Sequence, residues 1–108
     1  MSYQHNTDGC KWTATTTHGI DTVRLSVHGV CQEPTPGFKL TLSRANVPGS
    51  DPADLLLNLT VVAPTGIEPQ IVTATPVDYE QTFVIPKDRA PSRVTIFEAA
   101  STIDVKAA

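Results

Sequence analysis

Residues 10–31 read CKWTATTTHGIDTVRLSVHGVC, and the only two cysteines of the chain stand at the two ends of this stretch. Two segments in which apolar and polar residues alternate, 11–17 and 22–31, flank the four residues HGID (18–21). Alternation with a period of two is typical of a half-buried β-strand. The stretch therefore predicts an antiparallel hairpin that turns at 18–21.

The register of this hairpin decides what the cysteines do. If Trp12 faces Gly29, the missing side chain of the glycine leaves room for the indole, and Cys10 then faces Cys31. Directly opposed residues have Cα atoms roughly 4.5–5.5 Å apart, and a disulfide tolerates about 4.4–6.8 Å. We expect a disulfide in an oxidising compartment and two buried thiols in a reducing one.

A zinc site is the weakest interpretation of the same residues. Four ligands could be drawn from His5, Asp8, Cys10 and Cys31. Zinc sites usually show CxxC or CxxH spacing, which the chain lacks. We expect no metal site.

The rest of the chain repeats the alternating pattern between loops rich in proline and glycine. The expected strands are 11–17, 22–31, 38–44, 55–63, 70–75, 79–85 and 92–98. Seven short strands in 108 residues predict an all-β fold, an immunoglobulin-like antiparallel β-sandwich. We expect residues 1–108 to form a single domain, with 1–9 and 99–108 as mobile tails, although the second tail could extend the last strand.

The alternation also predicts which side chains face the core. The inward residues are Trp12, Val23, Leu25, Val27, Phe38, Leu40, Leu42, Leu57, Leu59, Val61, Phe83 and Ile85. One segment, SDPADLLLNL (50–59), also fits a helical turn, with Asp51 as the cap and Pro52 at the first helical position. We prefer a strand from about Leu55, because apolar and polar residues alternate from Leu57 onward.

The segment QIVTAT (70–75) lies between two prolines. Proline cannot donate a ladder hydrogen bond, so a strand bracketed in this way suits the edge of a sheet. An edge has unpaired N–H and C=O groups and can accept a strand from another chain. Gln70, Val72 and Ala74 are therefore the candidate contact residues for a protein partner or a second copy, and a short, protected edge is the alternative.

The distribution of charged and apolar residues indicates which classes of partner to exclude. The net charge is −3, and the 8 basic and 11 acidic residues are spread along the chain. A nucleic-acid-binding protein usually clusters its Lys and Arg, so we expect no nucleic acid. The first residues lack the basic and apolar regions of a signal peptide, and no apolar run reaches the ~20 residues that cross a bilayer. We expect no membrane contact, and the localisation stays open.

No set of residues predicts catalysis or a cofactor. The six glycines are scattered, without GxxxxGK[ST] or GxGxxG, and no GxSxG occurs. Solvated positions explain His5, His18 and His28. Asp78 and Glu80 share one face of a strand, a spacing more typical of a solvated face than of glycoside hydrolysis. The chain is therefore expected not to be an enzyme and to bind no cofactor.

Residues 35–97 resemble a known family. TPGFKLTLSR (35–44) is a Gly-aromatic strand start, LLLNLTVVAPTG (55–66) ends its strand in Ala-Pro, and QIVTATPVDYEQTFVIPKD (70–88) closes in Ile-Pro. This order resembles the C-terminal domain of bacterial proteins that stabilise a protease complex. The chain departs from that pattern at 35–38, which reads TPGF in place of a double glycine. The resemblance implies a non-catalytic β-sandwich that acts through protein contacts, and it transfers no site residues.

The leading interpretation is a non-enzymatic β-sandwich interaction or accessory domain. The alternative is a module that binds a small polar ligand or a carbohydrate. Such modules usually present exposed aromatic side chains, and the chain has six aromatic residues. Alternation buries Trp12, Phe38 and Phe83. Tyr3 and Phe97 remain available to a ligand.

Overall fold

The computed structural model of the chain describes residues 10–45, 47–49, 51, 53–66, 69–85, 90–97 and 101–107. They form seven strands and no helix, so the predicted all-β fold is confirmed. The strands are β1 (Cys10–His18), β2 (Thr22–Glu33), β3 (Lys39–Arg44), β4 (Asp54–Val62), β5 (Thr73–Val84), β6 (Arg93–Ile96) and β7 (Ser101–Ala107). None of the described segments is a helix that could span a bilayer.

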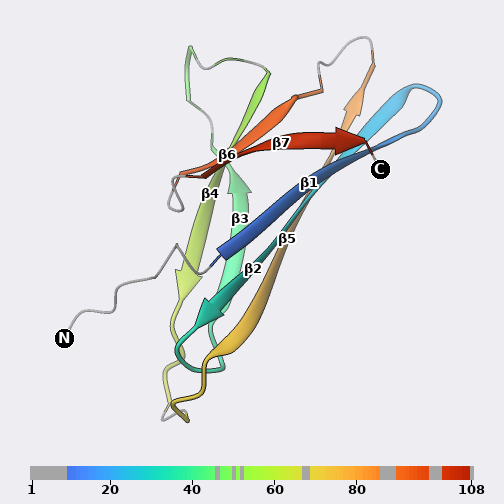
Figure 1. The fold of residues 1–108 in the computed structure, drawn as a ribbon. Coiled ribbons are helices and arrows are strands. Elements are labelled where there is room, and N and C mark those ends of the chain that lie inside the picture. The colour runs from blue at the N-terminus through green and yellow to red at the C-terminus, as the bar shows by residue number, and fades with distance from the viewer. Residues whose placement is uncertain are drawn as a thin grey trace.

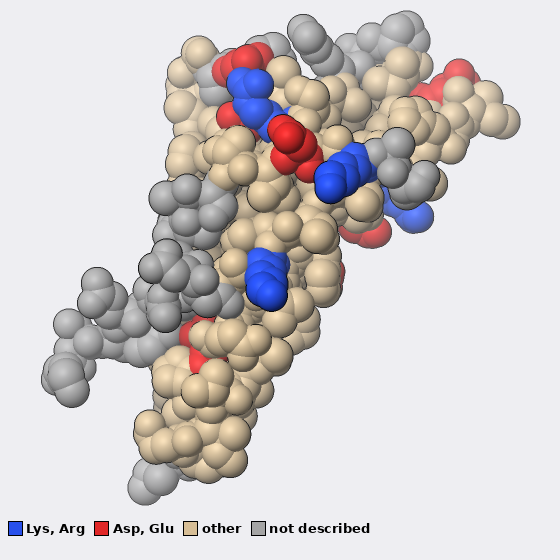
Figure 2. Space-filling view, viewed as in Figure 1, with Lys and Arg blue, Asp and Glu red and all other residues tan. Residues whose placement is uncertain are grey.

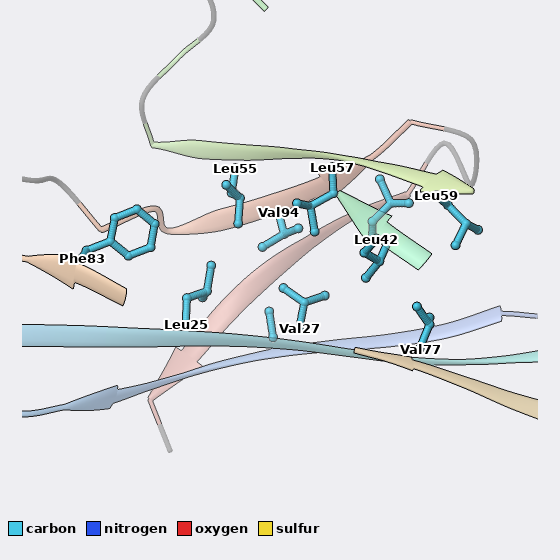
Figure 3. Close-up of a cluster of buried hydrophobic side chains, with 11 residues drawn as sticks. Leu25, Val27, Leu42, Leu55, Leu57, Leu59, Val77, Phe83 and Val94 are labelled. Atoms are coloured by element: carbon cyan, nitrogen blue, oxygen red, sulfur yellow. The ribbon is translucent and has the colours of Figure 1, made fainter. Parts of the chain in front are cut away.

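The seven strands make one mixed sheet in the order β3-β4-β6-β7-β1-β2-β5. The sheet folds over, so that β1, β2 and β5 face β3 and β4 across the core (Figures 1 and 3). β7 joins the two halves, since it pairs with β6 and with β1. The two end strands, β3 and β5, approach each other, which gives the sheet a nearly barrel-like shape.

Two pairs of neighbouring strands, β4–β6 and β1–β7, are parallel. The expectation of a fully antiparallel fold is therefore wrong for these pairs. Neither pair is joined by a hairpin, and parallel neighbours need a longer crossover connection. The immunoglobulin-like arrangement stays a prediction.

The predicted β1–β2 hairpin has the expected register. Trp12 faces Gly29 and Cys10 faces Cys31. The two sulfur atoms are 2.06 Å apart, at the bonding distance of a disulfide. The turn and the alternation together thus placed the cysteines correctly.

The prediction of two separate strands at 70–75 and 79–85 is wrong, because β5 replaces both. One strand runs from Thr73 to Val84 and passes through Pro76, which lies opposite Val30. β5 ends the strand order, and β2 is its only partner among the described strands. Proline is tolerated there because its missing N–H can face away from the neighbouring strand. Residues 70–72 precede the strand.

The chain ends also differ from the expectation. Residues 101–107 form a separate strand, β7, where the sequence predicts a tail that could extend the last strand. The first tail, 1–9, lies outside the described residues. At 51–55 the preferred strand is confirmed, although it begins at Asp54. Asp51 caps a turn before it, since its carboxylate accepts a hydrogen bond from the Ala53 N–H at 2.9 Å.

The core lies between the two layers (Figure 3). Eight predicted members are buried: Val23, Leu25, Val27, Phe38, Leu42, Leu57, Leu59 and Phe83. Four others pack against the core but are only half-buried: Trp12, Leu40, Val61 and Ile85. β6 pairs with β4 only at 54–57, so the second half of β4, which carries Val61, has β3 as its only described neighbour.

Candidate functional site

One end of the molecule presents large aliphatic side chains on described residues that carry no charge. It comprises the described residues of 62–76, which connect β4 to the start of β5 and include no Lys, Arg, Asp or Glu. We call this the apolar end. Val62, Ile71 and Val72 are 52%, 60% and 69% exposed there. At the lower tip of Figure 2, where the β4–β5 connection lies in Figure 1, the described residues show none of the charged side chains seen higher on that face.

Local hydrogen bonds fix the chain before β5. The Ile71 N–H donates to the Pro69 carbonyl oxygen at 2.9 Å, and the Thr73 hydroxyl donates to the Ile71 carbonyl oxygen at 2.8 Å. The backbone polar groups are thus partly satisfied within the segment. The aliphatic side chains of residues 71 and 72 are left in solvent.

A hollow of about 250 Å³ lies beside this segment. Gly37, Lys39 and residues 62–66 line it. Lys39 lies opposite Val62 in the β3–β4 ladder, so a single basic side chain borders the hollow. The apolar end therefore has a concave part next to its exposed aliphatic residues.

The predicted edge residues Gln70, Val72 and Ala74 are all exposed, and only Ala74 lies within β5. In an antiparallel ladder, the N–H and C=O of a given residue point to the same side. Since Pro76 has no N–H to give to β2, the even-numbered residues of β5 direct their backbone groups away from β2. A partner strand would thus meet Ala74 and then a position without a donor, so strand pairing at 73–75 is short.

A polar row crosses the outer face of β2 and β5. His28 Nδ1 lies 2.6 Å from an oxygen of Asp78, and the Ser26 hydroxyl donates to Glu80 at 3.2 Å. Both acids are on the exposed face that the alternation predicted. Because Ser26 donates to a carboxylate rather than to His28, these groups do not form a serine–histidine–acid relay. No local pattern in the sequence predicts these contacts, which depend on pairing between segments about fifty residues apart.

A second charged cluster holds the start of β4 against β6. Arg93 lies 2.9 Å from Asp51 and 3.4 Å from Asp54, and the Thr95 hydroxyl donates to Asp54 at 3.0 Å. The hydrogen bonds that Arg93 donates to Asp54 and Asp51 hold the pKa of its guanidinium above its ordinary value. These contacts join β6 to Asp54 of β4 and to Asp51 of the turn before it, so we assign the cluster to the parallel β4–β6 pair.

The remaining sequence candidates are dispersed. His18 and Phe97 are exposed, while His5, Asp8 and Tyr3 lie outside the described residues. The described residues contain no group of three or more His, Cys, Asp or Glu side chains that could hold a metal ion.

Comparison of the chain with protein-family models, curated proteins and solved structures found no match. The resemblance of residues 35–97 to proteins that stabilise a protease complex therefore stays a prediction.

Proposed function

We propose that this chain is a non-enzymatic interaction domain that holds a protein partner on its apolar end. The observation that carries the proposal is the exposure of Val62, Ile71 and Val72 in a segment whose described residues carry no charge. Exposed apolar patches with polar rims are typical of interaction sites. Burial of such side chains stabilises a complex by about 25 cal/mol per Å².

The chemistry of the apolar end indicates the kind of partner. A short edge at 73–75 can add few backbone hydrogen bonds, so aliphatic contact must supply most of the binding energy. The partner surface is therefore apolar, and it can belong to another protein or to a second copy.

The fold suits this role as a rigid carrier of the contact segment. An immunoglobulin-like sandwich, the arrangement expected from the sequence, would present its loops and edges in the same way. The resemblance of residues 35–97 also supports protein contacts.

Val72→Lys tests the proposal, with Val84→Lys as the matched control. Both valines are exposed, at 69% and 48%, and Val84 lies at the other end of β5. Partner capture from a lysate of the source organism, or self-association in sedimentation velocity, should fall by about tenfold or more for Val72→Lys only. Circular dichroism should show both variants folded.

Two results would contradict the proposal. Equal binding by the two lysine variants would mean that the apolar end is not the contact surface. Unfolding by Val72→Lys alone would mean that Val72 is packed in solution.

A further inference from the structure

β7 changes partners half-way along its length, and this leaves a fork beside β1. Residues 101–104 pair with β6, and only residues 105–107 pair with β1, at 14–16. Before residue 14, no described strand lies beside β1 on the side away from β2. Figure 1 shows β7 and β1 converging at an angle toward the end of β7.

Trp12 directs its backbone toward this fork. The backbone N–H and C=O groups of the even-numbered β5 residues point away from β2, because Pro76 has no N–H to donate to that strand. In the observed registers, the backbone N–H and C=O groups of the even-numbered β2 residues must then point toward β1. Those of the odd-numbered β1 residues point toward β2. The backbone N–H and C=O of Trp12 therefore point away from β2 and into the fork.

The indole of Trp12 adds a third polar group. Its Nε1 atom is buried and has no hydrogen-bond partner among the described residues. A buried donor without an acceptor costs about 1–3 kcal/mol. A ligand that brings an acceptor, such as a carbonyl oxygen, would remove that cost.

A cavity of about 340 Å³ occupies the fork. Trp12 and Thr13 of β1 line it together with Ile103, Asp104 and Lys106 of β7. One acidic and one basic side chain border it, so the wall favours neither a cation nor an anion. The apolar part of the wall, Trp12 and Ile103, suits an uncharged aliphatic side chain.

The disulfide anchors the β1 side of the fork to β2. It ties the first residue of β1 to β2, so residues 11–13 remain a strand although only β2 pairs with them among the described residues. An edge that is already extended costs a ligand little ordering entropy.

We propose that the fork binds an extended peptide, which pairs with the Trp12 backbone and inserts an aliphatic side chain beside the indole. This is β-strand addition at an unpaired edge. A peptide supplies both the N–H and the C=O that the Trp12 backbone needs, as well as the acceptor for Nε1. The fork lies on the side of β1 away from β2 and β5, so this site is separate from the apolar end.

The chain has one tryptophan, so its fluorescence reports this site without a label. The probe is a capped heptapeptide of alternating threonine and valine with a lysine at each end. We expect a saturable blue shift of the emission. The same peptide with every backbone N methylated should bind about tenfold more weakly or not at all. Glucose, which tests the carbohydrate alternative, should cause no shift.

Two variants complete the test by calorimetry. Trp12→Phe keeps an aromatic ring but removes the indole donor, and it should weaken peptide binding by about two- to tenfold. Val72→Lys should leave peptide binding unchanged, which separates this site from the apolar end. The proposal is overturned if the parent peptide gives no saturable shift, if the methylated peptide binds equally well, or if glucose alone shifts the emission.

Discussion

Replacing Gly29 by alanine should disturb the packing of Trp12 on β2. A Cβ atom at position 29 would lie 2.2 Å and 2.3 Å from two carbon atoms of the indole ring. Carbon atoms in favourable contact lie about 3.5–4.0 Å apart. The ring or the strand must therefore move by more than about an ångström. Both contacted atoms belong to a rigid ring and not to the end of a flexible chain.

The expected loss follows from this geometry. Overpacking of this kind costs about 1–3 kcal/mol. In the absence of a clash, Gly→Ala at a compatible position stabilises by about 0.4–1 kcal/mol, because alanine restricts the unfolded chain. The sign of the effect therefore depends on the indole. For a domain of about 100 residues, each kcal/mol changes Tm by roughly 4 °C or more.

The assay is a double-mutant cycle with Trp12→Leu, which removes the ring. Urea unfolding followed by circular dichroism gives the four stabilities. Gly29→Ala should destabilise the parent protein by about 1–3 kcal/mol and should be neutral or stabilising in the Trp12→Leu protein. An equal loss in both backgrounds would refute the reasoning, because the clash would then not be the cause.

Two further predictions concern the same framework. Reduction of the Cys10–Cys31 bond should cost roughly 3 kcal/mol on the chain-entropy model and should lower Tm without loss of strand content in circular dichroism. Two free thiols in air-oxidised protein, counted after denaturation, would contradict adjacency. Leu57→Ala should cost about 2–5 kcal/mol, as buried leucines do, and Leu40→Ala should cost less because its side chain is half-buried. Equal losses of unfolding free energy for the two variants in urea would contradict this difference in burial.

The hairpin at 10–31 could be predicted in register because its information is local. A short turn fixes which residues oppose each other, and the alternation fixes the face. Trp12 opposite Gly29 then gives a steric reason for one register. The cysteines follow from that register without any knowledge of the rest of the fold.

The parallel pairs could not be predicted, because no local feature specifies them. β4 meets β6 across the whole of β5 in sequence, and β7 meets β1 from the other end of the chain. The period-two pattern of STIDVKA (101–107) was visible in the sequence. The sequence does not show which strands this segment pairs with. Without a known partner strand, the segment is predicted to be a tail.

The proline at position 76 led to one correct and one wrong prediction. It correctly indicates an edge, since β5 ends the strand order. It does not end the strand, because a missing donor costs nothing where the N–H would have faced away from β2. The candidate residues Gln70, Val72 and Ala74 are therefore exposed, yet two of them precede the strand.

The partial burial of Trp12 follows from a competition for the first half of β7. In the β1–β7 register, continued pairing would place Ile103 beside Trp12. Instead, Ile103 lies opposite Val94 of β6, and the hydroxyls of Thr95 and Thr102 are hydrogen-bonded at 3.0 Å. Val94 is fully buried, so the contacts to β6 close the core between the layers. Closing the core there leaves the indole half covered. The alternation predicts Trp12 to be buried because it reports the face of β1 and carries no information about which strand covers that face.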